Sequence, residues 1–222
     1  MKNPYFGRLL TAMVTPFNAD GSVNYEKAAD LAEWLINNGS DGLVVAGSTG
    51  EAATMNAEEK LELFRVVVNR INKRVPVIAG TGSNNTADSV KMTKMAEAMG
   101  VDGALIVGPY YNKPTQEGLY RHFKTIAEAV DIPVIITVTR EDTDIEARLR
   151  AGASILNVAA GPRTPDVVRL IREKNPQVPI IASGGKTGES IRQTIAAGAN
   201  AITFTPPSTQ ELFKEMMERY RE

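Results

Sequence analysis

Short apolar runs rich in β-branched residues alternate with longer amphipathic stretches along this whole sequence, and this alternation limits its fold more than any other feature. Eight such runs begin near Leu9, Leu43, Val77, Ala104, Val134, Ile155, Ile180 and Ala201. Alternating β and α segments are typical of parallel sheets covered by helices. The sequence therefore predicts an α/β protein built from eight βα units.

The residues that precede these runs repeat with a period of two units. Three odd-numbered runs follow a proline, at Pro76, Pro133 and Pro179. All four even-numbered runs follow a glycine, at Gly39, Gly100, Gly152 and Gly198. Glycine suits the left-handed conformation that ends a helix, and proline is tolerated at the first residue of a strand. Four βαβα elements predict one (β/α)₈ TIM barrel over residues 1–222. The alternative is an open doubly wound sheet, but no Gly-x-Gly-x-x-Gly fingerprint follows the first run.

Helix-start signals lie just after the predicted strands. Asn56 precedes Glu59 by three residues, Thr164 is followed by Pro165, and 208–211 has the form of a capping box. These loops would form the barrel face on which active sites sit.

Composition excludes several classes of function. The 25 Lys and Arg nearly balance the 26 Asp and Glu, which argues against nucleic acid or an anionic membrane as a partner. The chain has no cysteine and one histidine, so we expect no metal site, and no motif calls for a cofactor. No apolar run is long enough to span a membrane or form a signal peptide, which predicts a cytoplasmic protein.

Three segments of the first half form an ordered set of motifs. They are the opening Leu10–Phe17, the turn Gly47-Ser48-Thr49-Gly50-Glu51, and the loop Pro109-Tyr110-Tyr111-Asn112-Lys113-Pro114. In this order and spacing, residues 7–136 resemble the dihydrodipicolinate synthase / N-acetylneuraminate lyase family.

The resemblance implies roles for three residues. In that family a lysine on strand six forms a Schiff base with pyruvate, and a relay of hydroxyl groups carries protons. Ser48 matches a relay hydroxyl, Thr49 matches the neighbour that binds the pyruvate carboxylate, and Tyr111 matches a relay tyrosine supplied across a dimer interface. An alternative interpretation is that Ser48 and Thr49 only cap the following helix.

Two features of the family pattern are missing from the second half. Thr137 stands where the family has its strand-five tyrosine, and no lysine occurs between Lys124 and Lys174. Without an amine on strand six, no Schiff base forms there in the family's manner.

The two halves also differ in length. The first four units occupy 125 residues up to Val134, and the remaining units occupy 88 residues. Variation in loop length is one explanation. The loss of resemblance at the same place favours a second one, a seam near 134–140 in a natural hybrid or an engineered chimera whose second half barrel has another origin.

The second half has candidate ligand groups of its own. Gly184, Gly185, Lys186 and Thr187 follow strand seven, where many barrels bind a phosphate on backbone amides. A tight turn with a solvated lysine explains the same residues. Arg140 after strand five and Lys113 after strand four are further candidates for binding an anion.

These observations lead to several hypotheses. The first is a hybrid scaffold of lyase ancestry with little or no native lyase activity. The second is a barrel that binds a phosphorylated small molecule at the loops after strands seven and eight. The third is a lyase whose nucleophile is relocated to Lys186 or Lys113, and the last is a scaffold without a ligand. The expected partner is a small carboxylate or phosphate, and the expected state is a monomer or weak homo-oligomer.

Overall fold

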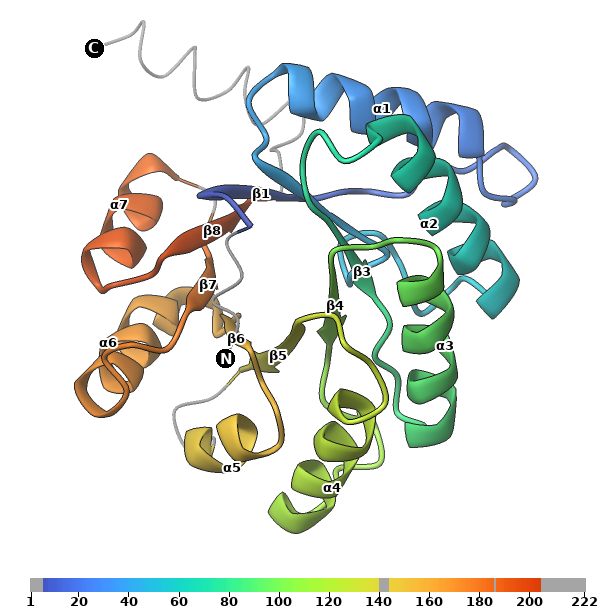
Figure 1. Cartoon of the computed structure of the whole chain (residues 1–222). Coiled ribbons are helices and arrows are strands. Elements are labelled where there is room, and N and C mark those ends of the chain that lie inside the picture. Colours follow the sequence, from blue (N-terminus) through green and yellow to red (C-terminus); the bar gives the residue numbers. More distant parts are fainter. Residues whose placement is uncertain (1–5, 140–143, 186, 205–222) are drawn as a thin grey trace, which may run out of the picture.

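The computed structural model describes residues 6–139, 144–185 and 187–204, and this part of the chain forms a closed parallel barrel. Each strand pairs with its neighbours in the sequence, and β8 closes the ring against β1 (Figure 1). The predicted (β/α)₈ barrel is therefore confirmed.

The strands are short and begin within one residue of the predicted positions. They are β1 Leu9–Ala12, β2 Gly42–Val45, β3 Val77–Gly80, β4 Gly103–Ile106, β5 Val134–Val138, β6 Ile155–Val158, β7 Ile180–Ser183 and β8 Ala201–Phe204.

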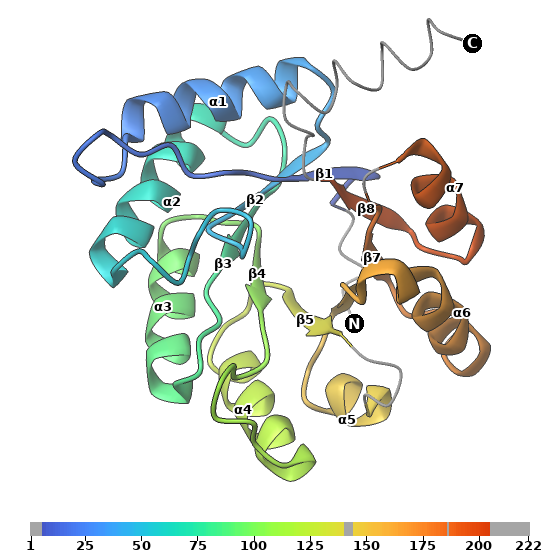
Figure 2. The ribbon, with the colours of Figure 1, turned by 180° about the vertical axis from the view of Figure 1, so that it is seen from behind.

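The helices lie outside this ring of strands, as the two opposite views show (Figures 1 and 2). They are α1 Tyr25–Asn37, α2 Ala57–Ile71, α3 Thr86–Ala98, α4 Gln116–Ala127, α5 Ile145–Arg150, α6 Thr164–Lys174 and α7 Gly188–Ala196, with a 3₁₀ turn at Gly161–Arg163. The predicted capping box at Asn56 is confirmed. Helix α6 begins at Thr164 itself, one residue earlier than the sequence predicts, and 208–211 lies outside the described residues.

The four glycines that precede the even strands all have positive φ, as the repeat predicts. The φ angles are 101° at Gly39, 88° at Gly100, 101° at Gly152 and 108° at Gly198. Residues with a Cβ rarely adopt this region, so these glycines end the preceding helices and turn the chain into the next strand.

The core has an inner and an outer part. Inside the barrel, one buried residue of nearly every strand contributes to a single cluster, with members such as Leu10, Ile135 and Ile155. Alternate strand residues face the helices and form two outer clusters, one under α1 and α2 and one under α4 to α6. Because side chains alternate along a strand, this arrangement fixes which residues line the barrel interior.

The sheet is continuous across the predicted seam. Residues of β4 and β5 pair in register, with Leu105 opposite Ile135 and Ile106 opposite Ile136. Strand β8 pairs with β1 through Leu10 and Thr203. The second half therefore closes the same hydrogen-bonded barrel as the first, and the length difference does not interrupt the structure at Val134.

Candidate active site at the barrel mouth

The carboxyl ends of the eight strands meet at one end of the barrel, which we call the mouth. Side chains alternate along a strand, so the residue two positions after a member of the inner cluster also faces the interior. On strands β5 to β8 these residues are Thr137, Asn157, Ser183 and Thr203. We call these four residues the polar layer. Strands β1 and β3 have small residues at the equivalent level, Ala12 and Gly80. Hydrogen-bonding groups on one side and small side chains on the other leave room for a small polar ligand.

The turn Gly47–Glu51 follows β2 and is held by its own backbone. Gly50 and Ala52 donate their N–H groups to the carbonyl of Gly47 over 3.1 and 3.3 Å. The buried Thr15 hydroxyl donates to the carbonyl of Gly50 over 2.6 Å. The loop after β1 therefore anchors this turn at the mouth.

Gly80 on β3 allows this turn to pack so closely. A Cβ at Gly80 would lie 2.0 Å from the carbonyl oxygen of Ala46, which itself has φ 51°. Such a contact is impossible without moving the backbone. The absence of a side chain on β3 thus determines where the hydroxyl groups of the turn lie.

Ser48 and Thr49 occupy the tip of the turn, with Ser48 exposed and Thr49 half-buried. Helix α2 starts only at Ala57, and its cap is Asn56, which accepts from the N–H of Glu59 while Glu59 accepts from that of Asn56. The alternative that Ser48 and Thr49 cap this helix is therefore wrong. These two residues therefore belong to the turn after β2 and not to the start of α2.

The loop after β4 carries Tyr110, Tyr111 and Lys113 on its surface. Tyr111 is 94% exposed with φ 71°, and Lys113 is exposed with φ 38°. Positive φ is unfavourable for residues with a Cβ, so the loop conformation is locally strained. In a single chain the Tyr111 phenol contacts solvent rather than a desolvated pocket.

The amide of Asn157 on β6 is a site group that the sequence argument missed. Asn157 is 9% exposed and pairs in register with Thr137 on β5. Its Nδ2 lies 3.5 Å from the hydroxyl oxygen of Thr137, at the long limit for a hydrogen bond. The signal was available, because Asn157 lies two residues after the inward-facing Ile155 in an otherwise apolar strand.

The polar layer continues from β6 to β7 through a buried threonine. The Thr164 hydroxyl lies 3.2 Å from that of Ser183 and accepts from the backbone N–H of Ala160 over 3.1 Å. These bonds hold the loop after β6 against the end of β7. They define the shape of the mouth on the side of the second half.

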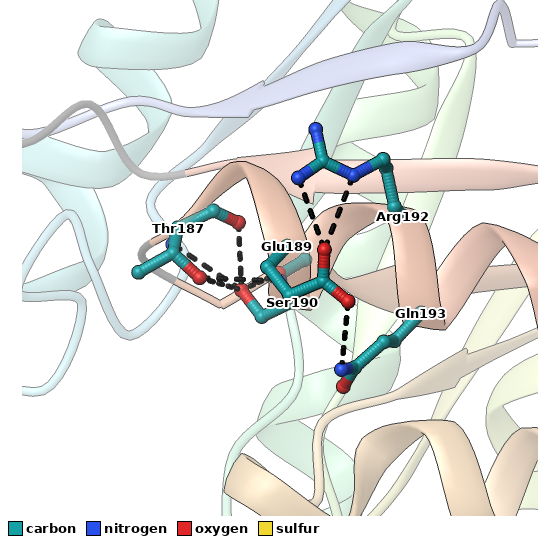
Figure 3. A network of polar contacts seen from close by, with 6 residues as sticks. Thr187, Glu189, Ser190, Arg192 and Gln193 are labelled. Carbon is teal, nitrogen blue, oxygen red and sulfur yellow. Dashed lines mark hydrogen bonds and ion pairs between the residues drawn. The ribbon is translucent and has the colours of Figure 1, made fainter.

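Several polar groups of the loop after β7 form hydrogen bonds within the loop and with the first turn of α7 (Figure 3). The N–H of Gly184 donates to the carbonyl of Thr203, and the Thr187 hydroxyl accepts from the N–H of Ser190. The Ser190 hydroxyl donates to the carbonyl oxygens of Gly184 and Thr187, and Gly185 takes φ 75° to make room for it.

The first turn of α7 is also acidic. The Glu189 carboxylate accepts from Arg192 over 3.0 Å and from Gln193 over 3.0 Å (Figure 3). A phosphate would meet this carboxylate at the helix end, where an anion is otherwise favoured. The prediction of a phosphate site at Gly184, Gly185 and Thr187 is therefore not supported.

Two predicted anion-binding residues, Arg140 and Lys186, lie outside the described residues. Lys113 is described, but it projects from the outer loop after β4. Among the described residues no group of three His, Asp or Glu side chains could hold a metal ion. In the same part of the chain no helix is both long and apolar enough to cross a membrane.

A cavity of about 520 Å³ lies beside the mouth, between α2 and α3. Its lining includes Lys60, Ser83, Met92 and Tyr110. Burial lowers the pKa of the Lys60 ammonium from its ordinary value. This cavity adjoins the mouth but does not include the polar layer.

Comparison with known proteins assigns the whole chain to one family. The sequence profile described as "Dihydrodipicolinate synthetase family" matches residues 5–220. This chain belongs to the dihydrodipicolinate synthetase family.

Individual relatives agree with this assignment. The chain is 40% identical over 243 aligned positions to the 4-hydroxy-tetrahydrodipicolinate synthase of Bacillus velezensis, and the alignment covers 94% of this chain and 84% of the relative. Identity rises to 62% over 131 residues with 4-hydroxy-tetrahydrodipicolinate synthase 2 of Halalkalibacterium halodurans, covering 59% and 45%. Alignments with three of the first four relatives span only 44–58% of the relative's length.

Solved structures of the family share the fold. The dihydrodipicolinate synthase of Bacillus anthracis superposes with a TM-score of 0.82 at 36% identity, over 98% of this chain and 76% of that one. The enzyme of Acinetobacter baumannii, solved in complex with pyruvate, gives a TM-score of 0.79 at 34% identity, over 90% and 70%.

These matches correct the interpretation of the second half. A family profile that extends to residue 220 includes all strands after Val134. The expectation of a hybrid or chimera with a half barrel of another origin is therefore not supported. The second half is a family half barrel in which particular side chains differ, Thr137 and Asn157 among them.

Proposed function

We propose that this chain binds a small 2-oxo carboxylate of the pyruvate class at the barrel mouth and handles its keto group without an imine on β6. The proposal rests on one observation, namely that two sets of polar groups lie on opposite sides of the mouth. The Gly47–Glu51 turn presents hydroxyl groups at the end of β2, and the polar layer lies on strands β5 to β8. In a closed barrel of eight strands, β2 and β6 face each other.

Carboxylate recognition suits the turn. Hydroxyl and backbone N–H donors at a fixed turn bind a carboxylate with charge-assisted hydrogen bonds. The Acinetobacter baumannii relative is a pyruvate complex, which supports a ligand of this class.

The absence of an imine on β6 follows from the residues themselves. A Schiff base requires a neutral amine next to the keto carbon. Strand β6 contains no lysine, and the side chain that faces the interior at the level of the polar layer is Asn157. The keto group therefore meets an amide at this position.

Calorimetry with pyruvate tests the carboxylate contact. We expect the double variant Ser48→Ala, Thr49→Val to weaken binding at least about tenfold, because it removes two donors to a charged group. Thr125→Ala on α4 is the matched control, since Thr125 is exposed and donates to the carbonyl of Arg121 in its own helix. Equal affinity in wild type and the double variant would refute the proposed site.

Borohydride reduction in the presence of pyruvate, followed by peptide mapping, tests the handling of the keto group. We expect no reduced adduct. An adduct on Lys186 or Lys113 would instead establish the relocated-lysine alternative. The mapping must resolve Lys60 as well, because burial lowers its pKa and it lines a separate cavity.

Self-association is tested separately. Near the loop after β4, Leu119 and Tyr120 pack against the outer core, whereas Tyr110 and Tyr111 are exposed. We propose a monomer or weak homo-oligomer, with any association through the Tyr110–Tyr111 loop. Sedimentation velocity over a concentration series measures this, and a stable oligomer at low concentration would contradict it.

A further inference from the structure

The geometry points to Asn157 as the residue that binds the keto oxygen of the 2-oxo acid and sets the preference for acids that carry this oxygen. This inference rests on the proposed function and adds the group that recognises the second half of the ligand. It requires that the Asn157 amide faces the mouth, has donor capacity to spare, and lies across from the carboxylate contact.

Orientation follows from the strand. Ile155, two residues earlier, belongs to the inner cluster, whereas Leu156 and Val158 belong to the outer one. Alternation therefore directs Asn157 inward, and its position near the end of β6 places it at the mouth. It is the inward-facing residue of β6 at the level of the polar layer.

Donor capacity follows from the hydrogen bonds. A primary amide has two N–H donors and one carbonyl acceptor. The only side-chain bond found for Asn157 among the described residues is the contact with Thr137, and at 3.5 Å it is weak. An amide at 9% exposure without strong partners gains free energy from a ligand acceptor. Thr137 is a positioning residue, because its hydroxyl restrains the amide without replacing that acceptor.

Ligand geometry fits this placement. The carboxylate and keto group of a 2-oxo acid are adjacent, so a carboxylate bound near β2 directs the rest of a small molecule across the mouth. Gly80 and Ala12 contribute no bulk at this level of the barrel. The keto oxygen can then accept from Nδ2 of Asn157 in a site partly shielded from water, where hydrogen bonds to carbonyl oxygens are strengthened.

Comparison of pyruvate with propionate isolates the keto contact, because propionate keeps the carboxylate and lacks the 2-oxo oxygen. We expect wild type to bind pyruvate about tenfold more tightly than propionate, because one hydrogen bond to a buried amide contributes about this much to the affinity. In Asn157→Leu, whose new side chain has a similar volume, the two acids should bind about equally well. The affinity for propionate should change less than about twofold. Thr137→Val should reduce the preference by a smaller factor.

Two outcomes separate the inference from the proposed function. If Asn157→Leu keeps the wild-type preference for pyruvate, Asn157 does not bind the keto oxygen, although a carboxylate site exists. If wild type binds neither acid, the proposed function fails and the inference fails with it.

A second variant tests the same position by a covalent reaction. In Asn157→Lys the introduced amine would add to the keto carbon of pyruvate with loss of one water, and borohydride would deliver hydride to the resulting C=N bond. Burial favours the neutral, nucleophilic amine. We expect a reduced adduct mapped to position 157, and none at position 125 in the exposed control Thr125→Lys. A folded Asn157→Lys protein without an adduct would overturn the inference.

Discussion

Two arginines in the second half, Arg148 and Arg172, differ in what their guanidinium groups contact. Arg148 on α5 is 7% exposed, and among the described residues its Nε and Nη1 have no hydrogen-bond acceptor. Its guanidinium carbon lies 5.0 Å from the ring centre of Phe123. Burial lowers the pKa of Arg148, and the charge of Asp144 offsets part of this effect. We therefore predict that Arg148→Met stabilises the protein.

The magnitude follows from the groups involved. Two buried N–H donors without acceptors each destabilise the folded state by about 1–3 kcal/mol, whereas a desolvated cation–π contact stabilises it by roughly 2 kcal/mol. Methionine keeps the packing of the stem and gains a sulfur–aromatic contact of about 1 kcal/mol. The expected gain is about 1–2 kcal/mol, which raises Tm by roughly 2–6 °C for a chain of this size.

Arg172 on α6 is the matched control. Its guanidinium donates to the carbonyl oxygens of Gly198 at 2.9 Å, Pro176 at 3.0 Å and Val178 at 2.6 Å, and to Oδ1 of Asn200 at 2.5 Å. Arg172→Met leaves these acceptors without their donor, so we expect a loss of about 2–4 kcal/mol. Thermal and urea unfolding monitored by circular dichroism measure both variants. A loss of more than about 1 kcal/mol in Arg148→Met would refute the reasoning, because it would mean that the guanidinium is well satisfied in solution.

Three further predictions follow from the same structure. Gly80→Ala should lower the free energy of unfolding by about 3 kcal/mol or more and weaken pyruvate binding, because the new Cβ would meet the carbonyl of Ala46. Urea unfolding and calorimetry measure the two effects, and unchanged binding would contradict the role of this glycine. Asn56→Ala should cost about 1 kcal/mol through loss of the α2 cap, with a Tm shift of roughly 2–4 °C and unchanged ligand affinity as the checks. Burial lowers the pKa of His122, the one histidine of the chain. The unfolded chain should therefore bind a proton on this imidazole near pH 6 that the folded protein does not bind, so Tm should fall as the pH drops from 7.5 to 5.5. This fall should be smaller in His122→Gln, and an equal pH dependence in both proteins would contradict it.

Much of the fold could be predicted from the sequence because its signals are local. A glycine such as Gly39 or Gly198 marks a helix end whatever the rest of the chain does, since only the backbone angle at that residue is involved. Apolar runs of strand length mark β segments for the same reason. The boundary of α6 was off by one residue, because either Thr164 or the proline after it could be the first helical residue.

The candidate site was predicted only in part. Ser48 and Thr49 were found through a resemblance, whereas the packing of Gly80 against Ala46 explains why their turn lies where it does. Asn157 could not be predicted from the family pattern, because that pattern places a lysine on strand six and assigns no role to an amide there. The phosphate prediction is not supported, and no sequence pattern shows that Thr203 and Ser190 form hydrogen bonds with Gly184 in the loop after β7.

The number of βα units, their order, and the hydroxyl-bearing and glycine-rich loops at one end of the barrel are all encoded locally in the sequence. Periodicity, turn residues and caps act over a few neighbouring residues, so they can be read without the fold. Which polar side chains share the mouth, and which of them already have hydrogen-bond partners, depends on the three-dimensional arrangement. Thr137 and Asn157 are 20 positions apart and meet only through the parallel register of β5 and β6. That register depends on closing the whole barrel, so no local pattern encodes it.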